Sequence, residues 1–296
     1  MKVLVAGGTG FIGSAIVRRA LEAGYRVACL SRGVQPAHHP RGVLVFKVDL
    51  VRPQGLERAL AGVDVVVHAV GILREGRSQT FERVHVGGTA NLLDACRRAG
   101  VAKLVYLSSL GAHLGRRNAY LRTKAEAERL IEYSGIPYTI FRPSLVFGAN
   151  DRLVTHVRRL VRVARVVPIL TTGHTLVQPI WVEDVATAVV RSLDDPKTNG
   201  HVYELGGPAP MTLADLVEAI KRSAGSPALS LPLPPAVGRP LGRLVQLLVD
   251  QPPLSTDQAA LLASGGTCDP SPAAVTFGLR LRRVGDVLAS TSPRTR

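Results

Sequence analysis

The chain has 296 residues, 46% of them hydrophobic and only 4% aromatic, so it can bury a sizeable core made mostly of aliphatic side chains. Its 37 Lys and Arg against 22 Asp and Glu leave a net charge of +15, which favours a phosphorylated cofactor, nucleic acid or an anionic membrane as partner. An Arg-rich compositional bias explains the charge equally well. The three cysteines are far apart and no Cys/His cluster occurs, which excludes a disulfide framework and predicts no metal site.

The start of the first predicted strand and the length of the apolar runs bear on where in the cell the protein is located. The first predicted strand begins at Lys2, which leaves no room for a signal peptide, and no run of 18 apolar residues occurs. We therefore expect a cytoplasmic protein with reduced thiols.

The first half of the chain alternates short aliphatic runs with helix-like segments. Such alternation is typical of βαβ units and predicts an α/β fold with a Rossmann-type, doubly wound parallel sheet. The predicted strands are 2–6, 26–30, 43–48, 64–70, 103–108 and 137–142, and the predicted helices between them are 12–23, 53–61, 79–99 and 119–134.

A glycine-rich loop joins the first strand to the first helix. Gly7, Gly10 and Gly13 have GxxGxxG spacing directly after an aliphatic strand, which is the context that makes this motif informative. Glycines there permit a tight turn and a close approach of backbone to pyrophosphate, and the helix N-terminus supplies N–H groups. The motif predicts a dinucleotide site; the alternative is a strand-to-helix turn without a ligand.

The end of the second strand bears on the choice of dinucleotide. NAD sites usually carry Asp or Glu here for the ribose 2′-hydroxyl, whereas this chain has Ser31 and Arg32. An arginine pairs with a 2′-phosphate through charge-assisted hydrogen bonds. We therefore predict that NADP(H) is preferred over NAD(H).

The alternation weakens after about residue 147, and helical patterns dominate. We predict an NAD(P)-binding Rossmann domain from 1–147 plus 178–205, a smaller, mainly helical substrate domain from 148–177 plus 206–289, and a disordered tail at 290–296. The predicted elements of this half are helices 151–167, 182–195, 212–225, 241–249 and 255–263, a strand at 201–205, and proline-rich loops at 232–240 and 252–253.

Further motifs follow one another along the chain: "VVHAVG" (66–71), "GGTANLLDACRRAGVAKLVYLSS" (87–109), "YLRTK" (120–124) and "FRPSLVFG" (141–148). Together with the glycine loop, they resemble the extended or atypical branch of the short-chain dehydrogenase/reductase superfamily, which includes the NAD-dependent epimerase/dehydratase-like proteins. In particular, the chain resembles bacterial relatives of the nucleotide-binding accessory subunit of respiratory complex I.

The resemblance implies a set of cofactor contacts. One departure is His85, where extended members usually carry Asn, and it leaves the role of helix 79–99 open. The implied contacts are Phe11 and Ile12 at the pyrophosphate, Asp49 and Leu50 at the adenine, Ala69, Val70 and Gly71 along the adenosine, and Pro143 and Val146 beside the nicotinamide.

Tyr120 and Lys124 are spaced i, i+4 and so share a helix face. A phenol with a pKa near 10 needs about 4 kcal/mol to transfer its proton near pH 7. An ammonium about 4 Å away at an effective dielectric of about 20 supplies roughly that amount. We predict that Tyr120 is a general acid/base tuned by Lys124 and that both border the cofactor. The resemblance assigns the partner hydroxyl to Ser109 rather than Ser108.

Segment 151–167 is basic on one side and aliphatic on the other. A basic amphipathic helix can lie on an anionic membrane, which would suit a lipophilic substrate such as a quinone. A solvated face of the substrate domain explains the pattern as well. The basic residues are Arg152, Arg158, Arg159, Arg162 and Arg165.

Three classes of function remain open. The first is an NADP(H)-dependent oxidoreductase, or a related epimerase/dehydratase-type enzyme, acting on a small molecule. The second is an NADP(H)-binding accessory, assembly or redox-sensing protein in which the chemistry is vestigial, because the segment between Ser109 and Tyr120 is short and Arg-rich. The third is an RNA-binding relative; no aromatic RNA-binding motif occurs, so we expect no nucleic-acid partner. By analogy, helices 79–99 and 119–134 are the expected faces of a homodimer.

Overall fold

The computed structural model describes residues 1–33, 43–76, 78–113, 115, 118–149, 151–163, 166–170, 175–233, 261 and 265–290. These residues pack into two compact units. The first comprises Met1–Pro143, Val182–Leu205 and Ser271–Leu279, and the second comprises Ser144–Trp181, Gly206–Pro270 and Arg280–Arg296. The units divide the chain after residues 143, 181, 205, 270 and 279.

Segment 271–279 belongs to the first unit, although the sequence pattern assigns it to the small domain. The reason is Phe277, which is buried and packs on Phe141 and Tyr203, with ring centroids 5.3 Å and 4.8 Å apart. The carbonyls of Phe277 and Gly278 also accept hydrogen bonds from Arg191 of the first unit.

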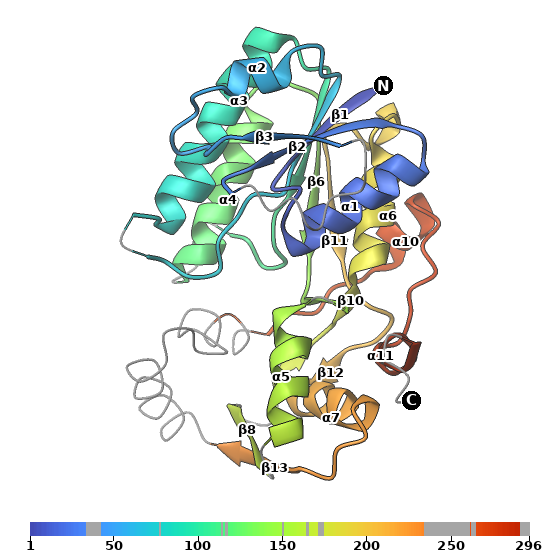
Figure 1. Ribbon diagram of the computed structural model, residues 1–296. Coiled ribbons are helices and arrows are strands. Elements are labelled where there is room, and N and C mark those ends of the chain that lie inside the picture. The colour runs from blue at the N-terminus through green and yellow to red at the C-terminus, as the bar shows by residue number, and fades with distance from the viewer. Residues whose placement is uncertain are drawn as a thin grey trace. The chain divides into compact units, whose positions relative to one another are not determined.

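A seven-stranded parallel sheet forms the centre of the first unit, in the order β11-β6-β5-β4-β1-β2-β3 (Figure 1). The strand order reverses between β1 and β4, which is the switch point where open α/β sheets bind ligands. The predicted doubly wound sheet is therefore confirmed. The strands are β1 (Lys2–Ala6), β2 (Arg26–Ser31), β3 (Leu44–Lys47), β4 (Val65–His68), β5 (Lys103–Leu107), β6 (Tyr138–Pro143) and β11 (His201–Leu205).

Helices cover both faces of this sheet, which explains why its strands are continuous aliphatic runs rather than alternating ones. Helices α1 and α6 pack together on one face, and α2, α3 and α4 lie on the other (Figure 1). The helices are α1 (Phe11–Glu22), α2 (Leu56–Leu60), η2 (Glu82–Gly87), α3 (Gly88–Ala99), α4 (Ala119–Glu132), α6 (Val182–Ser192), η3 (Pro196–Thr198) and α10 (Ser271–Thr276).

The predicted helix 79–99 consists of two different helical segments. Its first part, η2, is a π-helix, and only α3 is α-helical. Isolated π-helical turns are rare and occur frequently at functional sites. The aliphatic periodicity at 79–99 does not distinguish this wider turn from an α-helical one.

Among its described residues, the second unit combines three helices with three two-stranded pairings: β7 with β10, β9 with β12, and β8 with β13. Its core holds Phe147, Val154 and Val157 against Leu216 and Val287. The elements are β7 (Val146–Phe147), α5 (Arg152–Val163), β8 (Val166–Leu170), β9 (Leu176–Val177), β10 (Ile180–Trp181), β12 (Met211–Thr212), α7 (Leu213–Ser223), β13 (Leu229–Leu233) and α11 (Val284–Ser290).

Helix α5 is shorter than predicted, because it ends at Val163 and 166–170 form strand β8 instead of completing a helix to 167. The residues from 166 are β-branched and are followed by Pro168, which disfavours a helix. The aliphatic side of α5 is buried in the second unit, and its exposed side carries Arg159. Arg165, loop 252–253 and most of 234–264 lie outside the described residues, as does the predicted tail after Ser290.

Candidate functional site

The loop between β1 and α1 holds two backbone segments in close contact. Gly7 has φ +83°, and a Cβ there would lie 2.9 Å from the carbonyl oxygen of Ala69. A Cβ on Gly13 would lie 2.1 Å from the carbonyl oxygen of Gly7. Both contacts are too short for any side chain, so glycine is required at both places. The loop therefore has the tight form that a pyrophosphate site needs.

The N-terminus of α1 is open toward this loop. Gly10 is the N-cap, it offers no side-chain cap, and the first turn contains no acidic residue. The backbone amides of Phe11, Ile12 and Gly13 therefore present N–H groups and the positive end of the helix dipole. These residues fit a dinucleotide pyrophosphate, and they are the ones that the sequence pattern assigns to it.

Ser31 and Arg32 lie at the end of β2, beside the glycine loop. The buried Ser31 hydroxyl lies 2.9 Å from Thr9 Oγ1 and donates to the carbonyl of Gly33 at 2.6 Å. The exposed Arg32 guanidinium hydrogen-bonds Gln79 Oε1. Among the described residues, the neutral amide of Gln79 is the hydrogen-bond partner with which a phosphate would compete for the guanidinium.

The remaining predicted cofactor contacts lie in different settings. The carboxylate of Asp49 accepts the N–H of Val51 at 3.0 Å and so caps a turn. Leu50 is buried, and its backbone carbonyl accepts a hydrogen bond from Asn91. Ala69 and Val70 are partly buried after β4, and Gly71 is exposed; Pro143 ends β6 in the first unit, and Val146 begins β7 in the second.

Ser109 and Tyr120 come together at the end of β5. Tyr120 lies in the first turn of α4, whose N-cap Asn118 accepts the N–H of Leu121 at 3.3 Å. Burial raises the pKa of Tyr120, and a hydrogen bond with the Ser109 hydroxyl opposes that rise. The neighbouring Ser108 is buried, whereas Ser109 is only partly buried. Tyr120 therefore keeps its proton at neutral pH.

Lys124 is buried one helical turn beyond Tyr120. Its ammonium donates to the carbonyl of Leu107 at 2.5 Å and lies 4.4 Å from the ring centroid of Tyr106. Burial lowers the pKa of Lys124 to about 7, although the Glu128 carboxylate acts to raise it. Burial has the largest effect on the pKa of Tyr120 and raises it. That Lys124, together with a bound nicotinamide, tunes Tyr120 stays a prediction.

Two side chains that were not predicted as site residues enclose Tyr120. The rings of Phe81 and His85 meet the Tyr120 ring edge-on, with centroids 5.7 Å and 5.4 Å away. The sequence shows His85 only as a departure from the usual Asn. The i, i+4 spacing of Phe81 and His85 is a signal that they share a helix face.

His68 and His85 are both buried in the first unit. His68 Nε2 lies 2.9 Å from Thr89 Oγ1, and its Nδ1 faces the N–H of Val70 at 3.4 Å. Burial, together with the smaller effect of the Lys124 charge, lowers the pKa of His68 to about 3 and that of His85 to about 2. Both imidazoles are therefore neutral at physiological pH.

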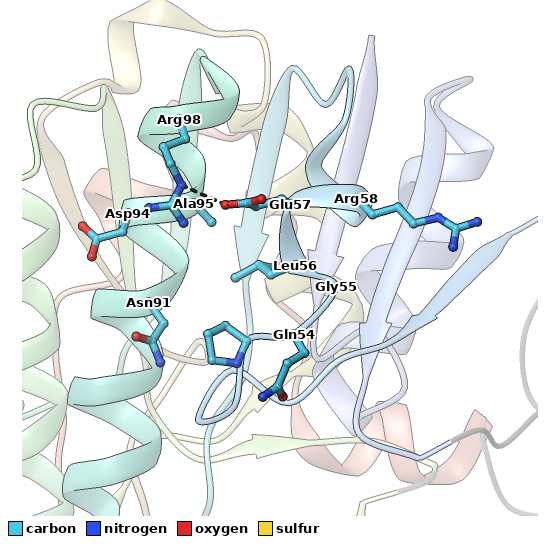
Figure 2. A pocket seen from close by; sticks show the side chains of 10 residues that line it. Gln54, Gly55, Leu56, Glu57, Arg58, Asn91, Asp94, Ala95 and Arg98 are labelled. Atoms are coloured by element: carbon cyan, nitrogen blue, oxygen red, sulfur yellow. Dashed lines mark ion pairs between the residues drawn. The ribbon is translucent and has the colours of Figure 1, made fainter.

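A hollow of about 650 Å³ lies elsewhere, between α2 and α3 (Figure 2). Arg98 and Glu57 point toward one another there and form an exposed ion pair of 3.1 Å, while Arg58 points away. No predicted site residue lines it. We therefore place the candidate site at the carboxyl ends of β1, β4 and β5 and not in this hollow.

The described residues show neither a metal site nor a membrane-spanning helix. They contain no group of three or more His, Cys, Asp or Glu placed to hold a metal ion. No helix in the described ranges is long and apolar enough to cross a membrane.

Comparison with known proteins identifies relatives of the chain. Residues 3–206 match the model of the NAD-dependent epimerase/dehydratase family. The chain is 31% identical over 226 residues to subunit 9 of the 1 alpha subcomplex of mitochondrial NADH dehydrogenase (ubiquinone) from Arabidopsis thaliana, which covers 72% of the chain and 56% of that protein. It is 28% identical to 2-alkyl-3-oxoalkanoate reductase from Stenotrophomonas maltophilia, over 94% of both chains.

A solved structure of an epimerase is also similar to this chain. UDP-glucose 4-epimerase from Thermus thermophilus, in complex with NAD, is 25% identical and superposes with a TM-score of 0.68 over 89% of this chain and 97% of its own. The match to the mitochondrial subunit confirms the predicted resemblance to that branch, although the chain spans only about half of that relative's length.

Proposed function

The chain belongs to the NAD-dependent epimerase/dehydratase family, and on that premise we propose that it is an NADP(H)-dependent oxidoreductase acting on a carbonyl or alcohol. The observation that carries this proposal is the placement of Ser109, after β5, and Tyr120, in the first turn of α4, at the carboxyl end of the sheet, where burial keeps Tyr120 protonated. A relative named 2-alkyl-3-oxoalkanoate reductase supports a ketone as the substrate class.

The chain's own residues divide the work between binding and proton transfer. The amides of Phe11 and Ile12 hold the pyrophosphate, and Arg32 pairs with the 2′-phosphate. Hydride is the chemistry that the nicotinamide group supplies when it is bound. Tyr120 donates its proton to the substrate oxygen, and Ser109 hydrogen-bonds the same oxygen.

The proposed role of Lys124 is to supply a positive charge near Tyr120. With a pKa of about 7, it is protonated in about half of the molecules at neutral pH. The ammonium lies one helical turn from Tyr120 and stabilises the phenolate that is left after proton transfer. Because its raised pKa keeps Tyr120 protonated at neutral pH, Tyr120 starts in the state that a general acid needs, which is the role required in carbonyl reduction.

The test begins with NADPH binding, followed by fluorescence, and continues with a panel of 3-oxoalkanoates, other ketones, aldehydes and quinones. We expect one class to oxidise NADPH. Tyr120→Phe should lower this turnover by at least about 100-fold, the usual worth of a general acid, while the Kd for NADPH stays within about twofold. Tyr133→Phe, which alters an exposed tyrosine at the end of α4, serves as the control and should change neither quantity.

The second candidate is a protein that binds NADP(H) without turning it over. The resting position of the Lys124 ammonium, on the Leu107 carbonyl, favours it, as does the similarity to a respiratory-complex subunit. Tight binding of NADPH that survives the whole panel unchanged would establish this function in place of the first.

A further inference from the structure

We propose that His85 is a positioning residue of the candidate site, which ties the backbone beside the predicted cofactor contact Gly71 to helix α4 and to the ring of Tyr120. This inference rests on the proposed function, because it gives Tyr120 a task that needs a fixed place. It concerns a side chain that the family's usual Asn does not predict.

The hydrogen bonds of His85 join two elements. Its Nε2 accepts the N–H of Ile72 at 3.1 Å, and its Nδ1 lies 2.9 Å from Thr123 Oγ1. A ring nitrogen that accepts an N–H carries no proton, so in the neutral ring Nδ1 holds the proton and donates to Thr123. The Thr123 hydroxyl in turn donates to the carbonyl of Ala119 at 2.9 Å, the residue before Tyr120.

Ring packing adds a second constraint on Tyr120. His85 is 1% exposed, and its ring meets that of Tyr120 at 82°. Phe81 stacks on His85 at 25° and meets Tyr120 at 77°. Edge-to-face contacts of this kind restrict how a ring can turn. The phenol is therefore held from the side by the same imidazole that holds Ile72.

Because His85 is neutral, its hydrogen bonds to Ile72 and Thr123 do not depend on pH in the working range. Its pKa is about 2, because the ring is buried and because a second positive charge beside Lys124 is unfavourable. The neutral tautomer, with one acceptor and one donor on opposite sides of a flat ring, persists at every pH at which the protein would work. An apolar ring fills the same space but bridges nothing.

The proposal is tested with two variants of His85. His85→Phe keeps a flat ring beside Tyr120 and removes both nitrogens. His85→Gln returns an amide oxygen toward Ile72. Ionisation of Tyr120 is measured as tyrosinate absorbance, by subtracting the titration of the same protein carrying Tyr120→Phe, and NADPH affinity is measured by fluorescence titration.

We expect His85→Phe to weaken NADPH binding by at least about tenfold and to lower the pKa of Tyr120 toward its ordinary value, as water enters the loosened site. His85→Gln should recover part of both losses. The control is Lys103→Met, which removes a buried lysine bound to Ser192 and Thr198 at the opposite end of β5; it should cost stability and leave both measurements unchanged.

The outcomes separate the two proposals. If His85→Phe leaves the ionisation of Tyr120 and the NADPH affinity as they are in the unaltered protein, the positioning role is overturned. If the unaltered protein binds no NADPH, the proposed function fails, and the tyrosine titration alone decides the role of His85.

Discussion

Arg32 projects from the end of β2 with its guanidinium on Gln79. A charge-assisted hydrogen bond is worth about 1.5–3 kcal/mol, which corresponds to a roughly 10- to 150-fold change in affinity. We expect Arg32→Ala to raise the Kd for NADPH by at least about tenfold and to leave that for NADH within about threefold, as measured by fluorescence titration. Arg58→Ala, at an exposed arginine of α2, is the control. Equal weakening of both cofactors would contradict a 2′-phosphate contact.

A substitution at Gly13 tests whether the glycine loop between β1 and α1 binds the pyrophosphate. A Cβ there would meet the Gly7 carbonyl oxygen at 2.1 Å, so Gly13→Ala forces the loop apart. We expect cofactor affinity to fall by at least about tenfold and the melting temperature to drop. Gly285→Ala, where a Cβ meets nothing within 4 Å, should leave both unchanged. Normal cofactor binding by the Gly13 variant would show that the loop does not carry the pyrophosphate.

Helix α4 carries Tyr120, Lys124 and Glu128 on one face, one turn apart; Lys124 and Glu128 are buried and Tyr120 is partly buried. Glu128 is 4% exposed and binds Arg142 of β6 through two hydrogen bonds of 3.0 Å and 2.6 Å. This ion pair anchors the helix to the sheet. It also places a carboxylate beside Lys124, where it raises the pKa of the ammonium.

We expect Glu128→Ala to lower the free energy of unfolding by about 3–5 kcal/mol, because it leaves Arg142 without its buried partner. The same helix offers a matched control in Glu126→Ala. The pair of Glu126 with Arg122 is 3.5 Å long and exposed, so its loss should cost less than about 1 kcal/mol. Urea unfolding measures both; equal losses would mean that the Glu128 pair does not anchor α4.

Element boundaries were predictable where local chemistry determines them. Gly100 adopts φ +66° and ends α3 at the position where the pattern 79–99 stops. Thr212 and Asp215 form the capping box that begins α7. The π-helical turn at η2 was missed, because the aliphatic periodicity does not distinguish it from an α-helical turn. The end of α5 at Val163 was missed although Val166, Val167 and Pro168 disfavour a helix there.

The buried histidines set how the stability of the whole molecule depends on pH. His68 and His85 have folded pKa values of about 3 and 2, below the unfolded value of 6.5. Between pH 6.5 and 3 the unfolded chain therefore binds more protons, so the stability contributed by neutral burial is complete above pH 6.5 and is lost as the pH falls.

We expect the free energy of unfolding to fall by roughly 1.4 kcal/mol per pH unit for each histidine below about pH 6.5. Urea unfolding between about pH 7 and pH 5 measures this slope. His68→Asn should reduce it by about one histidine's share, whereas His201→Asn, at an exposed position on β11, should leave it unchanged. A slope that is identical in all three proteins would show that His68 is not buried in its neutral form.

At the scale of the whole chain, the sequence by itself determined the parallel sheet, the glycine loop after β1 and the i, i+4 pair of Tyr120 and Lys124. Each of these follows from local rules: aliphatic runs that need two covered faces, backbone space that only glycine leaves, and the helical period. Arg32 at the end of β2 was predictable for the same reason.

Only the tertiary structure decided the electrostatics of the site. The ammonium of Lys124 lies on the carbonyl of Leu107, 17 positions away. His85 joins Ile72, 13 positions before it, to Thr123, 38 positions after it. Burial then raises the pKa of Tyr120 instead of lowering it. These properties depend on which groups the fold brings together and on how much water it removes from them. The spacing of residues along the chain predicts neither.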